Sequence, residues 1–224
     1  MEMWIVRRPR VLPVHTGYAI VKRIMDLALC VLALPLALPL GLLCSLAIWV
    51  ESRRPILFIQ ERIGRGGRRF RMFKFRTMLA NLDDSQHRAF MTAFVTGQLA
   101  AGKNGHKVFK PFTESEVTRV GRILRKTSLD ELPQLINVLR GEMSIVGPRP
   151  NVPWEVAAYR LWQHERLEVL PGITGLAQVR GRSGLTFNTI MRHDLEYVEN
   201  ASVWLDVKIL YWTVRSIVLG EGAQ

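Results

Sequence analysis

The sequence is poor in cysteine and lacks the motifs of several common protein classes. Its two cysteines, Cys30 and Cys44, lie in one apolar run with no histidine or acid that would activate a thiol. This placement argues against a disulfide framework and favours a packing role for both residues. The five histidines are scattered without the spacing of zinc ligands. No Walker-type phosphate-binding loop is present, and the GRGG segment is too short and too basic to replace one.

Acidic residues are also scarce compared with basic ones. The chain has 31 lysines and arginines against 19 aspartates and glutamates, which gives a formal net charge of +12. Such an excess predicts polyanionic partners, whether nucleic acid, anionic lipid or phosphorylated substrates. No nucleic-acid-binding motif is recognisable, and a membrane explains many of the basic residues. Nucleic acid is therefore not expected as a partner.

Residues 27–50 contain no charge at all. About two dozen apolar residues in a helix can cross a bilayer core of roughly 30 Å. Pro35 and Pro39 lack a backbone N–H, so the helix should bend or break near its centre. Basic residues flank both ends, which favours both ends on the cytoplasmic side. A re-entrant helix–break–helix satisfies these observations, although the residues alone leave an ordinary transmembrane helix with a proline kink equally open.

The rest of the chain predicts an α+β fold that is mostly helical. Residues 56–59 and 70–76 are typical of two strands joined by the basic GRGG turn, a small β-hairpin. PGITG, at residues 171–175, predicts a tight turn. Helical spacing, with Gly141 as a stop, covers residues 79–101, 132–139, 154–170 and 207–218.

Two further features of this pattern leave alternatives open. The amphipathic helix at 207–218 either lies in the membrane interface or packs on the core of its own domain. Asp26, which precedes the uncharged run, either pairs with one of the two basic residues just before it or remains solvated. Residues 103–116 are polar and predict a loop.

Two adjacent carboxylates, Asp130 and Glu131, precede the helix expected at 132–139. Helix capping is the simplest explanation of this pair, because Ser128 and Glu131 have the spacing of a capping box. Asp130 is the alternative N-cap, since Pro133 would then need no intrahelical bond. In both cases an ionised carboxylate lies at a helix end that also attracts phosphate. Such a carboxylate can attack phosphorus when cations neutralise the repulsion between the anions.

Candidate phosphate-binding cations lie in short motifs on both sides of this pair. Arginine suits bidentate contact with phosphate, and the two prolines around Arg149 in GPRP restrict its backbone. A Mg²⁺ ion held partly by the carboxylate pair and partly by a diphosphate would leave little trace in a sequence. Each cation alone is equally compatible with a solvated surface charge. The candidates are Lys74, Arg76, Arg125, Arg149 and Arg182.

The order of several motifs resembles that of the bacterial sugar transferases, the monotopic polyprenol-phosphate phosphoglycosyl transferases. The matching segments are KRIMDLALCVLALPLALPL, KFRTM, TRVGRILRKTSLDELPQLINVLRGEMSIVGPRP, LPGITGLAQVRGR and HDLEYVENASVWLDVKIL. They cover roughly residues 22–210, and the SLDELPQL…GEMSIVGPRP block is highly specific. The resemblance implies a basic leader at 1–21, a re-entrant membrane helix at 22–54, and a catalytic domain at 55–224. That domain would lie on the cytoplasmic face of the bacterial inner membrane.

The resemblance also implies a reaction. A phosphosugar would pass from a UDP-sugar to undecaprenyl phosphate, with release of UMP. Asp130 would be the nucleophile that forms a covalent phosphosugar intermediate, and Glu131 would bind Mg²⁺ and assist acid–base steps. Together with the carboxylate pair expected to hold Mg²⁺, this makes both Asp130 and Glu131 candidate metal ligands.

The matching positions for substrate phosphate or nucleotide are Lys74, Arg76, Arg125, Arg149 and Arg182. Asp194, in the DLEYV motif, would organise the site or anchor a loop. The competing hypothesis is a non-catalytic, membrane-anchored scaffold or lipid-binding protein. The sequence leaves open which sugar is transferred, which glycan pathway the product enters and whether subunits pair. It also leaves open whether the 79–118 stretch serves substrate choice or pairing between subunits.

Overall fold

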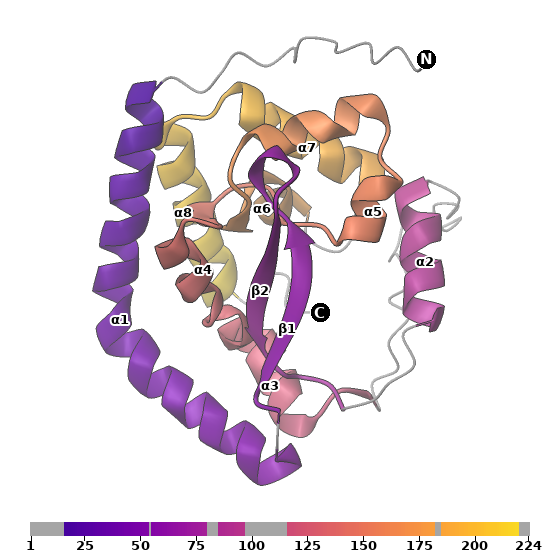
Figure 1. Cartoon of the computed structure of the whole chain (residues 1–224). Coiled ribbons are helices and arrows are strands. Elements are labelled where there is room, and N and C mark those ends of the chain that lie inside the picture. The colour runs from indigo at the N-terminus through magenta and orange to yellow at the C-terminus, as the bar shows by residue number, and fades with distance from the viewer. Residues whose placement is uncertain (1–15, 54, 80–84, 97–115, 182–184, 220–224) are drawn as a thin grey trace.

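The computed structural model describes residues 16–53, 55–79, 85–96, 116–181 and 185–219. The described part has an α+β fold that is mostly helical, as predicted (Figure 1). In chain order the elements are α1 (Thr16–Ser52), β1 (Leu57–Ile63), η1 (Arg65–Gly67), β2 (Arg69–Phe75), α2 (Ser85–Thr96), α3 (Arg119–Thr127), η3 (Leu129–Glu131), α4 (Gln134–Arg140), β3 (Ser144–Val146), α5 (Pro153–Ala157), η4 (Leu161–Glu168), β4 (Gly172–Thr174), α6 (Leu176–Gly181), α7 (Phe187–Glu199) and α8 (Val203–Val218), where η marks a 3₁₀ helix.

Helix α1 is long, apolar and bent around one side of the rest of the molecule (Figure 1). It passes through Pro35 and Pro39 as one helix, so the predicted break is wrong and the predicted bend is confirmed. Each proline removes a single backbone bond, and the intact turns on either side hold the helix together. By length and composition, α1 is the one helix in the described ranges that is able to cross a membrane.

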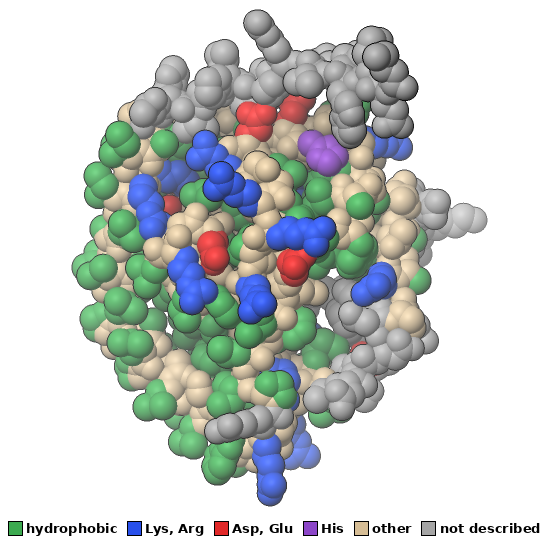
Figure 2. Space-filling view, viewed as in Figure 1, with side chains coloured by type: hydrophobic (Ala, Val, Ile, Leu, Met, Phe, Trp, Pro, Cys, Tyr) green, Lys and Arg blue, Asp and Glu red, His purple; other side chains and the backbone are tan. Residues whose placement is uncertain are grey.

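The side of α1 that faces away from the domain is hydrophobic and exposed. In Figure 2 this surface forms the green left and lower edge of the molecule, where Figure 1 places α1. Exposure of so much contiguous apolar area marks a membrane or protein interface. The exposed side chains include Ile24, Val31, Leu32, Leu36, Leu38, Leu42, Leu43, Leu46 and Val50.

The predicted β-hairpin is confirmed as the antiparallel pair β1 and β2. Its turn contains Gly66 and Gly67, both with positive φ, a conformation that residues with a Cβ rarely adopt. Helix α4 lies along the free edge of β2, where the Asn137 side chain bonds the Phe73 N–H at 3.1 Å and the Arg71 carbonyl at 2.7 Å. The hairpin is thereby fixed to the helix that follows the carboxylate pair.

Strands β3 and β4 form a short parallel pair that places the GPRP loop, residues 147–150. The expected tight turn at PGITG is therefore wrong, because this segment contains β4. A Cβ on Gly172 would lie 2.1 Å from the backbone nitrogen of Gly147, and one on Gly147 would lie 2.4 Å from the Leu170 carbonyl. The two backbone segments approach this closely only because both positions are glycine.

The helix expected at 154–170 is divided into α5 and η4, so that prediction is wrong. Arg160 has an extended backbone between the two pieces, with φ of −74° and ψ of 156°. The Gln163 side chain accepts a hydrogen bond from the Arg160 N–H at 2.7 Å and so begins a new turn. A local side-chain cap therefore interrupts a stretch whose spacing is helical.

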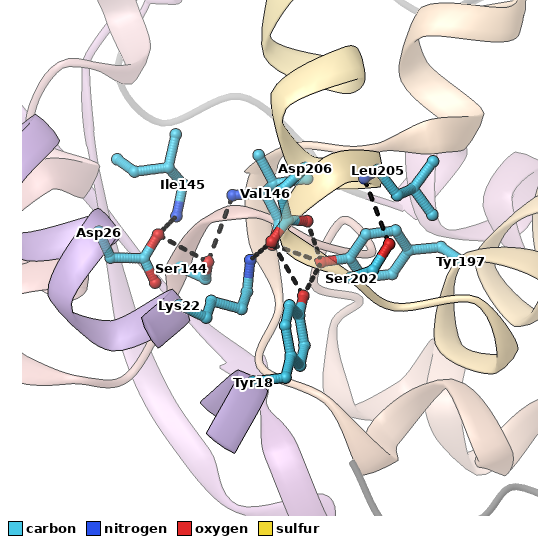
Figure 3. A network of polar contacts seen from close by, with 10 residues as sticks. All are labelled: Tyr18, Lys22, Asp26, Ser144, Ile145, Val146, Tyr197, Ser202, Leu205 and Asp206. Carbon is cyan, nitrogen blue, oxygen red and sulfur yellow. Dashed lines mark hydrogen bonds and ion pairs between the residues drawn. The ribbon is translucent and has the colours of Figure 1, made fainter. Parts of the chain in front are cut away.

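A buried polar network joins the N-terminal half of α1 to α8 (Figure 3). Asp206 is fully buried and forms an ion pair with Lys22 at 2.8 Å. The hydroxyls of Tyr18 and Tyr197 donate to the two oxygens of the same carboxylate, at 2.9 and 2.7 Å. Because loss of one partner would leave a buried charge unpaired, this network holds α1 firmly against α8.

Asp26 connects α1 to β3 in the same region (Figure 3). Its carboxylate accepts hydrogen bonds from the Ser144 hydroxyl at 2.9 Å and from the Ile145 N–H at 3.0 Å. Asp26 is fully buried. Both expectations for this residue, solvation or pairing with a preceding basic residue, are therefore wrong, because β3 supplies donors inside the fold.

Helix α8 packs on the core through one face and is exposed on the other. Ile209 is fully buried in a cluster with Val146 and Tyr197, which confirms packing on the core. Trp204 and Tyr211 are about two-thirds exposed, at 67% and 65%. The exposed face leaves contact with a membrane interface as a prediction that the structure does not test.

Candidate active site

The carboxylate pair lies on a 3₁₀ turn between two helices. Helix α3 ends at Ser128, whose φ of 58° is left-handed, and η3 then carries Asp130 and Glu131 towards α4. Ser128 makes no side-chain capping bond, and the N-cap of α4 is Pro133. Both capping interpretations are therefore wrong. The physical reason is that the Glu131 carboxylate is drawn away from the local backbone by cations from distant segments.

Glu131 binds two of the predicted cations. Its Oε1 atom accepts hydrogen bonds from Lys74 Nζ at 2.7 Å and from Arg149 Nη1 at 3.1 Å. Burial opposes the charge on Glu131, but the attraction of Arg149 and Lys74 is stronger and lowers its pKa to about 2. Glu131 is therefore a permanently ionised group that holds the two cations in place.

Asp130 has a different environment. It forms an ion pair with Lys74 at 3.8 Å and accepts no hydrogen bond from the residues that the structure describes. Burial raises the pKa of Asp130, Lys74 opposes this shift, and the charge of Glu131 reinforces it. Its side chain is 14% exposed. Asp130 is thus a partly accessible carboxylate with an electron pair available for attack.

The cations around the pair are subject to opposing effects of burial, like charges and carboxylates. Burial and the charge of Arg149 lower the pKa of Lys74, while the two carboxylates oppose that shift. The Arg149 side chain is half-exposed, so it can contact Glu131 and a bound ligand together. Arg125 donates from Nε to the Thr77 hydroxyl at 2.8 Å, and its charge opposes the rise in the pKa of Asp130. The structure therefore brings Lys74 and Arg149 into contact with the carboxylate pair and places the charge of Arg125 near Asp130.

Arg76, by contrast, contacts the end of α1. Its Nη2 atom donates to the Ser52 carbonyl at 2.9 Å, to the Ser52 hydroxyl at 2.6 Å and to the Arg53 carbonyl at 3.3 Å. Arg76 is buried there, and these contacts satisfy the last carbonyls of the helix. The structure thus brings Arg76 to the C-terminal end of α1 instead of to the carboxylate pair.

Asp194 lies behind the GPRP loop, and Arg182 lies outside the described residues. Asp194 is buried and forms an ion pair with Arg166 at 2.7 Å. No motif singled out Arg166, because it is one arginine in an ordinary charged stretch, HERLE. Only its burial shows that it belongs to the region around the site.

The carboxylate pair fits a metal ion only if a ligand shares it. The described residues contain no group of three potential metal-binding side chains. Glu131 Oε1 is occupied by Lys74 and Arg149, whereas Glu131 Oε2 and both Asp130 oxygens accept no hydrogen bond from described residues. Mg²⁺ is commonly held by one or two carboxylates together with substrate phosphates and water. The donor set therefore fits Mg²⁺ shared with a diphosphate.

Comparison with known proteins connects this geometry to one family. The model of the family described as bacterial sugar transferase matches residues 17–220. A UDP-N-acetylgalactosamine-undecaprenyl-phosphate N-acetylgalactosaminephosphotransferase of Aeromonas hydrophila is 39% identical over 217 residues, which are 92% of this chain and 46% of the relative.

Two shorter relatives are covered more completely. A UDP-glucose:undecaprenyl-phosphate glucose-1-phosphate transferase of Caulobacter vibrioides is 41% identical, over 90% of this chain and 71% of the relative. The exopolysaccharide production protein ExoY of Sinorhizobium fredii is 38% identical, over 90% of this chain and 87% of the relative. The chain spans less than half the length of several other curated relatives.

Proposed function

The chain belongs to the bacterial sugar transferase family, and we propose that it transfers a phosphosugar from a UDP-sugar to undecaprenyl phosphate through an Asp130-bound intermediate. The names of two relatives include undecaprenyl phosphate as a substrate of the transfer. The observation that carries the proposal is the contrast within the pair: Glu131 is held by two cations, whereas Asp130 accepts no hydrogen bond from described residues.

This contrast assigns a separate role to each carboxylate. An Asp130 oxygen attacks the β-phosphorus of the UDP-sugar, the bond between β-phosphorus and bridging oxygen breaks, and UMP leaves. A phosphate oxygen of undecaprenyl phosphate then attacks the same phosphorus, and the Asp130 carboxylate is regenerated. Each step moves one phosphosugar between two nucleophiles, so no oxidant or further reactant is needed.

Cations make the attack of an anion on an anion feasible. Lys74 and Arg149 reach the pair from two different segments, and the Arg149 side chain is half-exposed. Guanidinium and ammonium groups fixed before the reaction stabilise the charge of the transition state without further reorganisation. Mg²⁺ held by Asp130 or Glu131 together with the diphosphate would supply additional charge neutralisation when bound.

We further propose that α1 is a re-entrant anchor at the cytoplasmic face of the inner membrane, and its contacts support the re-entry. A straight helix of 37 residues would extend about 55 Å, enough to place its ends on opposite sides of a membrane. Here Lys22 contacts Asp206 near one end, and Ser52 contacts Arg76 at the other. Both ends of α1 thus dock on the same domain, which fits a helix that enters and returns on one side.

The intermediate can be tested without the lipid acceptor. Purified protein would be incubated with Mg²⁺ and a panel of tritiated UDP-glucose, UDP-galactose and UDP-N-acetylgalactosamine, then denatured and assayed for bound label. We expect at least one sugar to label the wild type, and Asp130→Asn to remove the label. Glu196→Gln, a change in an exposed surface ion pair, is the matched control and should label normally. Absence of label on the wild type, or full labelling of Asp130→Asn, would reject this mechanism.

A further inference from the structure

We propose that Arg166, supported by Asp194, is a positioning residue that aims Arg149 at the carboxylate pair. The inference rests on the proposed function, because it assumes that Arg149 binds the substrate diphosphate. Arg166 itself forms no hydrogen bond or ion pair with Asp130 or Glu131. Its effect on the reaction would be transmitted through the backbone of the GPRP loop.

The first observation is the contact between Arg166 and the loop. Arg166 Nη2 donates to the backbone carbonyl of Arg149 at 2.6 Å, and the same nitrogen lies 2.7 Å from Asp194 Oδ2. The side chains of Arg166 and Asp194 are only 2% and 3% exposed. A buried guanidinium beside a buried carboxylate has little freedom to move, so it fixes the position of the Arg149 carbonyl.

The second observation is that the same guanidinium also binds Asn151, the residue that follows the loop. Arg166 Nη1 donates to the Asn151 side-chain oxygen and to the Tyr159 hydroxyl, the latter at 2.7 Å. The loop is therefore bound at Arg149 and again just beyond Pro150 by one planar group. Lysine cannot reproduce this, because its single ammonium lacks the fork of donors.

The third observation follows the path from the loop to the pair. Gly147, at the start of the loop, is wedged against β4, and Arg166 holds Arg149 from the buried side. The Arg149 backbone carbonyl is thus held by Arg166, while the Arg149 side chain donates to Glu131 at 3.1 Å. A shift of the Arg149 carbonyl would move its guanidinium relative to Glu131, and small misplacements of this kind are costly in catalysis.

A double-mutant cycle separates positioning from general stability. Single-turnover labelling would be measured with the wild type, Arg149→Ala, Arg166→Lys and the double variant, using the UDP-sugar that labels the wild type best. We expect Arg149→Ala to slow labelling on the order of 100-fold, and Arg166→Lys to slow it about tenfold. In the Arg149→Ala background, Arg166→Lys should add less than about twofold, because the group through which it acts is gone.

The outcomes distinguish this inference from the proposed function. If Arg149→Ala labels at the wild-type rate, the proposed role of Arg149 fails and the positioning role fails with it. If Arg149→Ala is slow but Arg166→Lys has no effect, or slows both backgrounds by the same factor, only the positioning inference is overturned. Arg69→Lys, at an exposed ion pair with Glu61, controls for an arginine-to-lysine change and should leave the rate unchanged.

A milder variant serves if Arg166→Lys does not yield folded protein. Tyr159→Phe removes only the hydroxyl that accepts from Arg166 and keeps the packed ring. We expect labelling to slow about threefold, with no further loss in the Arg149→Ala background. An unchanged rate, or a loss that persists without the Arg149 side chain, would contradict the positioning role.

Discussion

At the scale of single residues, the site depends on two adjacent carboxylates with opposite electrostatic surroundings. Glu131 is stabilised as an anion by two direct cation contacts, and its pKa falls to about 2. Among the described residues, Asp130 has no cation closer than Lys74 at 3.8 Å, and burial raises its pKa against the opposing charges of Lys74, Arg149 and Arg125. The cations thus bind one carboxylate tightly and leave its neighbour reactive. A nucleophile that accepted the same hydrogen bonds would be more stable and therefore less reactive.

Replacement of Lys74 by alanine tests this division of roles. Lys74 is the strongest influence that lowers the pKa of Asp130, so its loss should raise that pKa further. The nucleophile must be ionised, and its ionised fraction falls as the pH drops through its pKa. The acidic limb of the labelling rate should therefore move to higher pH in Lys74→Ala, and the rate at neutral pH should fall on the order of 100-fold.

The pH profile of labelling measures this effect, and Lys126→Ala, at an exposed lysine, is the control. An acidic limb that stays in place or moves to lower pH would show that Lys74 does not stabilise ionised Asp130.

At the residue scale, motifs in the sequence singled out residues that the fold brings together, whereas their roles stay predictions. Asp130, Glu131, Lys74, Arg125 and Arg149 were predicted, and they lie together. The capping interpretation failed because Lys74, 57 residues before Glu131, competes for its carboxylate. Arg166 could not be predicted, since only the tertiary fold determines whether a lone arginine is buried or solvated.

At the scale of elements, nearby residues predicted the hairpin and the end of α4, whereas elements that depend on tertiary contacts were missed. The hairpin and the stop at Gly141, whose φ is 77°, follow from nearby residues alone. The strand in PGITG was missed because it exists only through its pairing with β3. That pairing in turn depends on glycines that are distant in sequence, and no local pattern reports it.

Gly172→Ala should disrupt the β3–β4 pair and the loop that it supports. A Cβ would lie 2.1 Å from the Gly147 nitrogen, so the strands must separate. We expect a loss of about 1–3 kcal/mol in the free energy of unfolding. Labelling should also slow, because Arg149 would lose its fixed backbone. Thermal unfolding in detergent and the labelling rate are the measurements.

Gly17→Ala, where a Cβ meets nothing within 4 Å, is the control and should match the wild type. An equally stable and equally active Gly172→Ala would contradict the close packing of these strands.

At the scale of the whole molecule, the long apolar helix α1 is packed into the same fold as the carboxylate pair. Asp26 holds β3, which leads into the GPRP loop, and Arg76 holds the other end of α1 beside the hairpin that carries Lys74. The exposed apolar side of α1 therefore has a fixed orientation relative to Asp130. A lipid-borne acceptor would then approach the site from a defined direction. The sequence predicted the apolar run and its bend, but not these contacts, because buried polar partners in distant segments leave no periodic pattern.

The topology of α1 can be tested by cysteine accessibility. In a background with Cys30 and Cys44 replaced by alanine, single cysteines would be introduced by Gly17→Cys and Pro55→Cys, both at exposed positions. Intact spheroplasts would be treated with a membrane-impermeant maleimide, before and after permeabilisation. A re-entrant helix with both ends docked on a cytoplasmic domain predicts that neither cysteine reacts until the membrane is opened. Reaction of Gly17→Cys alone in intact spheroplasts would establish a spanning helix. Reaction of both would place the domain outside the cell, where a UDP-sugar donor is not supplied.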